Sequence, residues 1–136
     1  MGKRKKVEGL WTRNKYLVLS VSQKEYRAIT KAMAQGLSYD TCWDWLVKAT
    51  STPGEKGEVV NAYLHLWGYF KKKATGEEKD RFFTVLKDYE EGRVQKDEIR
   101  TVIRQLLEKY PNEYLSQSSI LYGDIPLKEM EDATMA

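Results

Sequence analysis

Residues 61–73 read NAYLHLWGYFKKK, and this stretch decides which fold the sequence predicts. Together with two valines just before it, its apolar side chains cover the middle of a helix on nearly every side. These side chains are Val59, Val60, Tyr63, Leu64, Leu66, Trp67 and Phe70. A helix that is apolar all round is normally buried in a protein core. The stretch therefore predicts a central buried helix over about residues 58–73.

Helical patterns also fill most of the remaining chain. Ser22 and Thr75 are each followed at the third position by a glutamate, which is the capping-box signature of a helix start. Further apolar stripes predict helices over 12–20, from about 23 to 35, after Ser38, from 76 to 91 and over 97–110. Residues 50–57 form the longest internal break, and we expect this loop to be the most flexible point. Because no segment alternates with period two, we expect an all-α, single compact domain of five to seven helices packed around the central one.

We expect the chain to have three segments. We expect residues 1–10 to form a basic N-terminal arm, residues 11–126 a helical domain, and residues 127–136 a flexible C-terminal tail. The first 50 residues contain ten Lys or Arg against four Asp or Glu, although the net charge of the whole chain is only +3. A basic N-terminal half of this kind can attract polyanions.

The composition also disfavours several classes of protein. The single cysteine, Cys42, cannot form an internal disulfide or supply a site that needs several thiolates. Its place on the inner stripe of its helix predicts a small buried hydrophobe. The N-terminal residues lack the apolar segment of a secretory signal, and no run of roughly 18 apolar residues occurs. We therefore expect a cytoplasmic protein with no membrane partner, no metal and no other cofactor.

Basic residues are the first group of candidate functional residues. Those expected to bind a polyanion are Arg13, Lys15, Lys24, Arg27, Lys71, Lys72 and Lys73. If Trp11, Tyr16 or Trp45 is exposed among them, its ring can stack on a nucleic-acid base. The alternative is that the three consecutive lysines only complement the C-terminus of a helix, and that Trp11 or Tyr16 belongs to the core.

The only histidine belongs to the second group, which consists of Asn61, His65, Gly68 and Tyr69. Their spacing of 0, 4, 7 and 8 residues places them on one face of the central helix. One interpretation is a small polar pocket in which His65 exchanges protons near neutral pH. The other, which we favour, is a buried Asn61–His65 pair that is hydrogen-bonded inside the core. No nucleophile motif accompanies His65, so we predict no catalytic residue.

Four segments together resemble the YbgA-like family, a bacterial and archaeal domain of unknown function. They are WTRNKY (11–16), SQKEY (22–26), NAYLHLWGYFK (61–71) and YLSQ (114–117). The resemblance covers about residues 11–126. In many relatives this domain follows an iron–sulfur domain similar to the thiouracil desulfidases, which remove sulfur from thiolated pyrimidines. The chain departs from many relatives at Glu58 and Val59, where they are similar to Lys-His, and at Gln95 and Lys96, where they carry prolines.

The resemblance and the charges lead to three hypotheses about function. The first is a non-catalytic accessory module that binds RNA, DNA or a nucleotide in connection with base modification or sulfur removal, with an iron–sulfur desulfidase-like protein as a partner. The second is a protein-interaction module that docks on a partner enzyme through an exposed aromatic residue such as Trp45. The third is a small-molecule enzyme that uses His65, and it requires an open pocket at that side chain.

Overall fold

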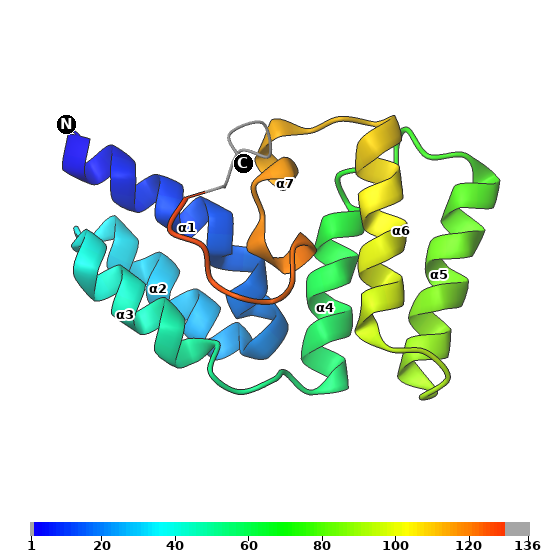
Figure 1. Cartoon of the computed structure of the whole chain (residues 1–136), viewed down its shortest axis with the longest axis horizontal. Coiled ribbons are helices and arrows are strands. Elements are labelled where there is room, and N and C mark those ends of the chain that lie inside the picture. Colours follow the sequence, from blue (N-terminus) through cyan, green and yellow to red (C-terminus); the bar gives the residue numbers. More distant parts are fainter. Residues whose placement is uncertain (1, 130–136) are drawn as a thin grey trace.

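The structure is a computed structural model that describes residues 2–129 of the chain. Within this range it contains seven α-helices, one short 3-10 helix and no strand, which confirms the predicted all-α, single-domain fold (Figure 1). The elements are α1 (Gly2–Val21), α2 (Gln23–Ala34), α3 (Tyr39–Ala49), α4 (Lys56–Trp67), α5 (Gly76–Glu90), α6 (Lys96–Lys109), α7 (Glu113–Ser116) and η1 (Ser119–Leu121). Of the predicted tail 127–136, only residues 127–129 lie within the described part.

The first helix begins ten residues earlier than the sequence predicted. Residues 2–10, expected to form an arm, are the first half of α1, and Thr12 lies inside this helix rather than at its cap. Val7, Leu10 and Trp11 are buried, and their spacing of 0, 3 and 4 residues places them on one face. The four basic residues before Val7 concealed this short apolar stripe, so the prediction of an arm separate from the helix was wrong.

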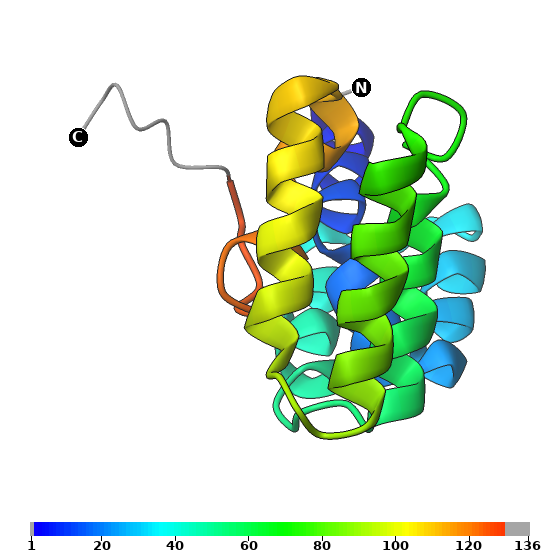
Figure 2. The same cartoon turned by 90° about the vertical axis from the view of Figure 1, so that its right-hand side faces the viewer.

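Helix α1 joins two hydrophobic cores, where the sequence suggested a single centre. It packs against α2, α3, α4, α7 and η1. Tyr16, Leu17 and Leu19 belong to a core built mainly by α4, α5 and α6, which we call the α4 core. Val7, Leu10, Trp11 and Val18 belong to a smaller core with α2 and α3, which we call the α3 core. In the view of Figure 2, α4, α5 and α6 stand in front of the first three helices.

Helix α4 occupies the middle of the α4 core, but one of its faces is open. Val59, Tyr63 and Leu66 are buried as predicted, whereas Leu64 keeps 40% of its surface exposed and His65 is exposed as well. The helix ends at Trp67, six residues before the predicted end at residue 73. Because a new helix starts at Gly76, the chain must turn over residues 68–74.

The two predicted capping boxes have different outcomes. At the start of α5, the Thr75 hydroxyl accepts the Glu78 N–H at 3.1 Å, and the Glu78 carboxylate accepts the Thr75 N–H at 2.8 Å. At the start of α2, the Ser22 hydroxyl accepts the Glu25 N–H at 3.1 Å. The Glu25 carboxylate instead accepts a hydrogen bond of 2.6 Å from the indole N–H of Trp45. Only half of the second box forms, because its glutamate joins α2 to α3.

The loop at residues 50–57 is fixed against the end of α1 at one point. A Cβ atom on Gly54 would lie only 1.8 Å from the carbonyl oxygen of Ser20. Real Cβ atoms do not approach a backbone oxygen this closely, so only glycine fits at this contact. The longest break in the helical pattern is therefore also the place where α1 and the segment before α4 meet.

The last described residues contact the beginning of α6 and return across α1 (Figure 1). Asp124 forms ion pairs with Arg100 at 2.6 Å and with Lys96 at 2.9 Å. The amide of the buried Asn14 donates to the carbonyl of Leu127 at 2.8 Å, and its oxygen accepts the N–H of Leu127 at 2.9 Å. Both backbone groups of Leu127 are thus bound by one side chain of α1.

Candidate functional site

Four side chains from distant parts of the sequence meet at one side of α1. We call Lys15, Tyr16, Tyr69 and Tyr114 the tyrosine–lysine cluster. The hydroxyl oxygens of Tyr16 and Tyr69 are 2.6 Å apart, and their rings meet edge to face with centroids 6.2 Å apart. The Lys15 Nζ lies 5.3 Å from the ring centroid of Tyr16 and 4.9 Å from that of Tyr114. The ammonium group therefore contacts two aromatic rings.

Three different segments hold this cluster in place. Helix α1 supplies adjacent Lys15 and Tyr16, the turn after α4 supplies Tyr69, and α7 supplies Tyr114. The short α7 is fixed at its start, where the side chain of Asn112 accepts the N–H of Leu115 at 3.0 Å. Leu115 is buried in the α4 core, and this anchors the neighbouring Tyr114 beside α1.

The electrostatic character of the cluster is positive. Lys15 is half-buried, and no ion pair in the described part of the chain includes it. A cation–π contact of this kind is worth about 0.5–1 kcal/mol at exposed sites and about 2 kcal/mol when desolvated. It orients the ammonium group without neutralising its charge. The cluster can therefore hold a phosphate group near Lys15.

The Tyr16 hydroxyl keeps its proton at neutral pH. Burial of its ring raises its pKa, and the hydrogen bond with Tyr69 and the neighbouring tyrosines raise it further. Tyr16 consequently acts as a neutral hydrogen-bonding group within the cluster. Tyr114 differs from it, because 46% of its surface is exposed and its ring remains available to a ligand.

Three exposed lysines follow Tyr69 closely in the sequence. We call Lys71, Lys72 and Lys73 the lysine turn, which begins two residues after Tyr69 and follows the end of α4. The ion pairs formed within residues 2–129 do not include any of the three. Their position past the C-terminus of α4 also agrees with the expected interaction with the helix dipole.

The structure divides the other predicted polyanion-binding residues among different surfaces. Arg13 and Lys15 are two positions apart on α1, so their side chains leave the helix on different sides. Arg13 donates a hydrogen bond to the backbone carbonyl of Lys128. Lys24 and Arg27 are exposed one turn apart on α2. Of the predicted set, Lys15 takes part in the tyrosine contacts, and the lysine turn follows Tyr69 along the chain.

Two of the three predicted stacking residues are buried. Trp11 is 8% exposed and Tyr16 is 7% exposed, so their rings cannot receive a base, and this prediction was wrong for both. Trp11 packs instead against Tyr26, with ring centroids 5.5 Å apart. Trp45 is half-buried and lines a groove of about 670 Å³ between α2 and α3.

Sequence reasoning missed Tyr114, which is the exposed ring of the cluster. It lies in a four-residue helix that is too short to show a periodic pattern. The available signal was its place in the segment YLSQ, one of the four segments that carried the family resemblance.

The four predicted pocket residues around His65 do not form a buried pair or a shared cluster. His65 is exposed and Asn61 is half-buried, so the two do not form a buried pair. A Cβ on Gly68 would meet only carbonyl oxygens of its own segment, the nearer being His65 O at 3.1 Å, so no other helix approaches there. Tyr69 turns toward Tyr16. The favoured interpretation of a core histidine was wrong because His65 lies on the open face of α4.

Cys42 is buried in the α3 core, as predicted. Burial raises the pKa of its thiol to about 11, so the reactive thiolate is scarce at neutral pH. Across residues 2–129, no group of three or more His, Cys, Asp or Glu side chains is placed to hold a metal ion. None of the described helices is long and apolar enough to cross a membrane.

Comparison with known proteins gives one match. A family model described as "Protein of unknown function (DUF1722)" matches residues 15–123, which include every member of the tyrosine–lysine cluster and the lysine turn. No curated protein and no solved structure matches the chain.

Proposed function

The chain belongs to the DUF1722 family of proteins of unknown function, and we propose that it is a non-catalytic module that binds single-stranded nucleic acid. The binding surface is the tyrosine–lysine cluster together with the lysine turn. The observation that carries the proposal is the contact of Lys15 with Tyr16 and the half-exposed Tyr114, at 5.3 and 4.9 Å. A positive charge and an exposed ring side by side are what a phosphate and an unpaired base require.

The arrangement favours a single strand over a duplex. Tyr114 offers one accessible ring, and stacking of a base on an aromatic side chain is worth about 1–3 kcal/mol. In a duplex the bases are stacked on one another and cannot stack on Tyr114. A duplex could therefore bind only through contacts of its phosphates with the lysines. Lys15 and the lysine turn provide four positive charges, which bind phosphates with little dependence on sequence.

The resemblance to the YbgA-like family indicates in which process such binding would serve. In that setting the chain holds a nucleic acid while a separate iron–sulfur, desulfidase-like protein acts on a base. This chain has one buried cysteine, so the sulfur chemistry is assigned to the partner.

The direct test is fluorescence anisotropy with labelled single-stranded RNA and DNA of about 12 nucleotides at low salt. We expect binding that weakens as the salt concentration rises. The slope of log affinity against log salt concentration should decrease in magnitude by about 0.7 for each phosphate contact that a substitution removes from a single strand. Lys15→Gln and Tyr114→Ala should each weaken it. Lys87→Gln removes an exposed lysine of α5 and is the matched control for loss of charge. Absence of binding at low salt, or equal losses in Lys15→Gln and Lys87→Gln, would contradict the proposal.

A second candidate function is docking of a partner protein at Trp45. It is supported by the groove of about 670 Å³ that the indole lines together with Val21 and Ala49. Co-purification of a partner that withstands nuclease treatment and is lost in Trp45→Ala would favour this function. If Trp45→Ala retains the partner, docking at this groove is excluded.

A further inference from the structure

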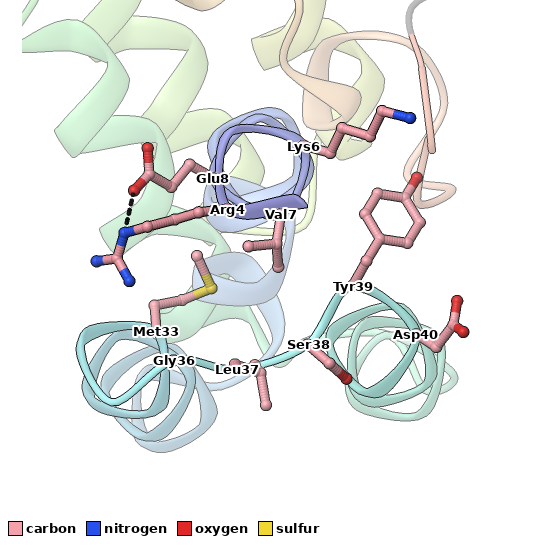
Figure 3. Close-up of a pocket in the computed structure, with 10 residues that line it drawn as sticks. All are labelled: Arg4, Lys6, Val7, Glu8, Met33, Gly36, Leu37, Ser38, Tyr39 and Asp40. Atoms are coloured by element: carbon pink, nitrogen blue, oxygen red, sulfur yellow. Dashed lines mark ion pairs between the residues drawn. The ribbon is translucent and has the colours of Figure 1, made fainter. Parts of the chain in front are cut away.

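Two adjoining cavities follow the N-terminal half of α1, on the side of the α3 core. One has a volume of about 450 Å³ and is lined by Lys5, Lys6 and Arg13, among others. The other has a volume of about 440 Å³ and includes Val7 and Met33 in its lining (Figure 3). Lys6 and Tyr39 line both cavities, so the two spaces share a wall. A single ligand can therefore occupy both.

The first cavity is basic. Its lining has three cationic side chains and one carboxylate, that of Glu129. Arg13 donates one guanidinium N–H to the carbonyl of Lys128, but its Nε is buried and has no hydrogen-bond partner among the described residues. A buried donor without an acceptor is unfavourable. The guanidinium nevertheless keeps its positive charge at the wall of this cavity, where it favours an anion.

The second cavity is more apolar, and two of its four charged lining residues pair with each other. Figure 3 shows Val7 and Met33 pointing into the space between α1 and the α2–α3 connection, while Asp40 points away from it. Arg4 and Glu8 neutralise each other through an ion pair of 3.1 Å. The ring of Tyr39 stands on the same side of α1 as Lys6. An apolar or aromatic group can therefore be buried beside the basic cavity.

We propose that the two cavities form one binding site for a small organic phosphate. The phosphate lies among Lys5, Lys6 and Arg13, and the apolar body of the ligand passes Tyr39 to contact Val7 and Met33. The phosphate comes either from a nucleoside monophosphate or from a simpler phosphate ester. This site is independent of the proposed nucleic-acid surface, because Arg13 and Lys15 leave α1 on different sides.

Isothermal titration calorimetry of the full chain tests the site with three probes: inorganic phosphate, phenyl phosphate and cytidine monophosphate. We expect phenyl phosphate to bind about tenfold more tightly than inorganic phosphate, because its ring is buried in the second cavity. Cytidine monophosphate binding at least as tightly as phenyl phosphate identifies a nucleotide site. Weaker binding of the nucleotide identifies a site for simpler esters.

Two variants and two controls locate the binding. Lys6→Gln should weaken phenyl phosphate about tenfold, since it removes a charge-assisted contact. Met33→Gln should weaken phenyl phosphate about fivefold and leave inorganic phosphate unchanged. Lys48→Gln, an exposed lysine of α3, is the control for charge, and Lys15→Gln should have no effect. Lys6 is exposed and takes no part in the hydrogen bond between Arg13 and Lys128, so its substitution leaves that contact in place.

The proposal is overturned if phenyl phosphate does not bind at millimolar concentration. Equal losses in Lys6→Gln and Lys48→Gln would also overturn it, because they would show general attraction to a basic protein. If the protein binds nucleic acid but not phenyl phosphate, the small-phosphate site is excluded and the proposed function is unaffected.

Discussion

The two cores on either side of α1 differ in size. In the α4 core, the rings of Trp67 and Phe82 stack with centroids 4.9 Å apart, and six helical elements contribute buried side chains. The α3 core is smaller, and two adjoining cavities open beside it along α1. The difference suggests that the α4 core supplies most of the stability, while the side near the α3 core has room for a ligand.

The largest expected effect is in the α4 core. Phe82→Ala should lower the free energy of unfolding by about 3–5 kcal/mol, because it removes a buried ring and leaves a cavity against Trp67. Urea denaturation followed by tryptophan fluorescence measures the change. Phe83→Ala is the neighbouring control, since Phe83 is exposed and should cost about 1 kcal/mol or less. Similar losses in the two variants would show that the α4 core is not closely packed.

A smaller effect is expected where the loop before α4 meets α1. Gly54→Ala should destabilise the protein by about 1–3 kcal/mol, because its Cβ would collide with the carbonyl oxygen of Ser20. Thermal unfolding measures the loss. Gly57→Ala, in the first turn of α4 with no atom near its Cβ position, should be neutral or stabilise by up to about 1 kcal/mol. If Gly54→Ala is also neutral, the loop does not hold the two regions together.

The smallest effect is a pH dependence at the outer end of the α4 core. The hydrogen bond from the Thr75 N–H, with those from Tyr110 and Lys109, lowers the pKa of Glu78 from its ordinary value of 4.5 to about 2. Because the folded pKa is the lower one, the stabilisation is complete above pH 4.5 and is lost as the pH falls toward 2. Glu78→Gln should therefore reduce the acid sensitivity of unfolding, and Glu77→Gln should not. Equal acid sensitivity in wild type and Glu78→Gln would contradict this assignment.

The sequence allowed the fold class to be predicted because helical periodicity is a local signal. The stripes that contain Phe82, Ile103 and Leu46 all lie on buried faces. The start of α1 could not be predicted in the same way, because Val7 and Leu10 form only a short apolar stripe among lysines. Both side chains are buried by packing in the core that α1 shares with α2 and α3. His65 was placed in the core for a related reason. A helix with apolar residues on every side need not be covered on every side.

The candidate site could be predicted only in its parts. Lys15 and the lysine turn were recognisable from charge. The contact between the two segments that contain them is the hydrogen bond between Tyr16 and Tyr69, which are 53 residues apart. Tyr114 joins them through a helix too short to have a pattern. Conversely, Trp11 and Tyr16 are aromatic and near basic residues, yet tertiary packing buries both. Contacts between distant segments decide which rings a ligand can reach.

Under the proposed function, we expect nucleic acid to bind where α1, the turn after α4 and α7 meet. The most direct measurement is a titration of the isotope-labelled chain with single-stranded RNA, followed through its backbone amide chemical shifts. The account predicts changes concentrated at Lys15, the lysine turn and Tyr114, with the exposed residues of α5 unaffected. Changes centred on Lys24 and Arg27 of α2, or no changes at low salt, would contradict it.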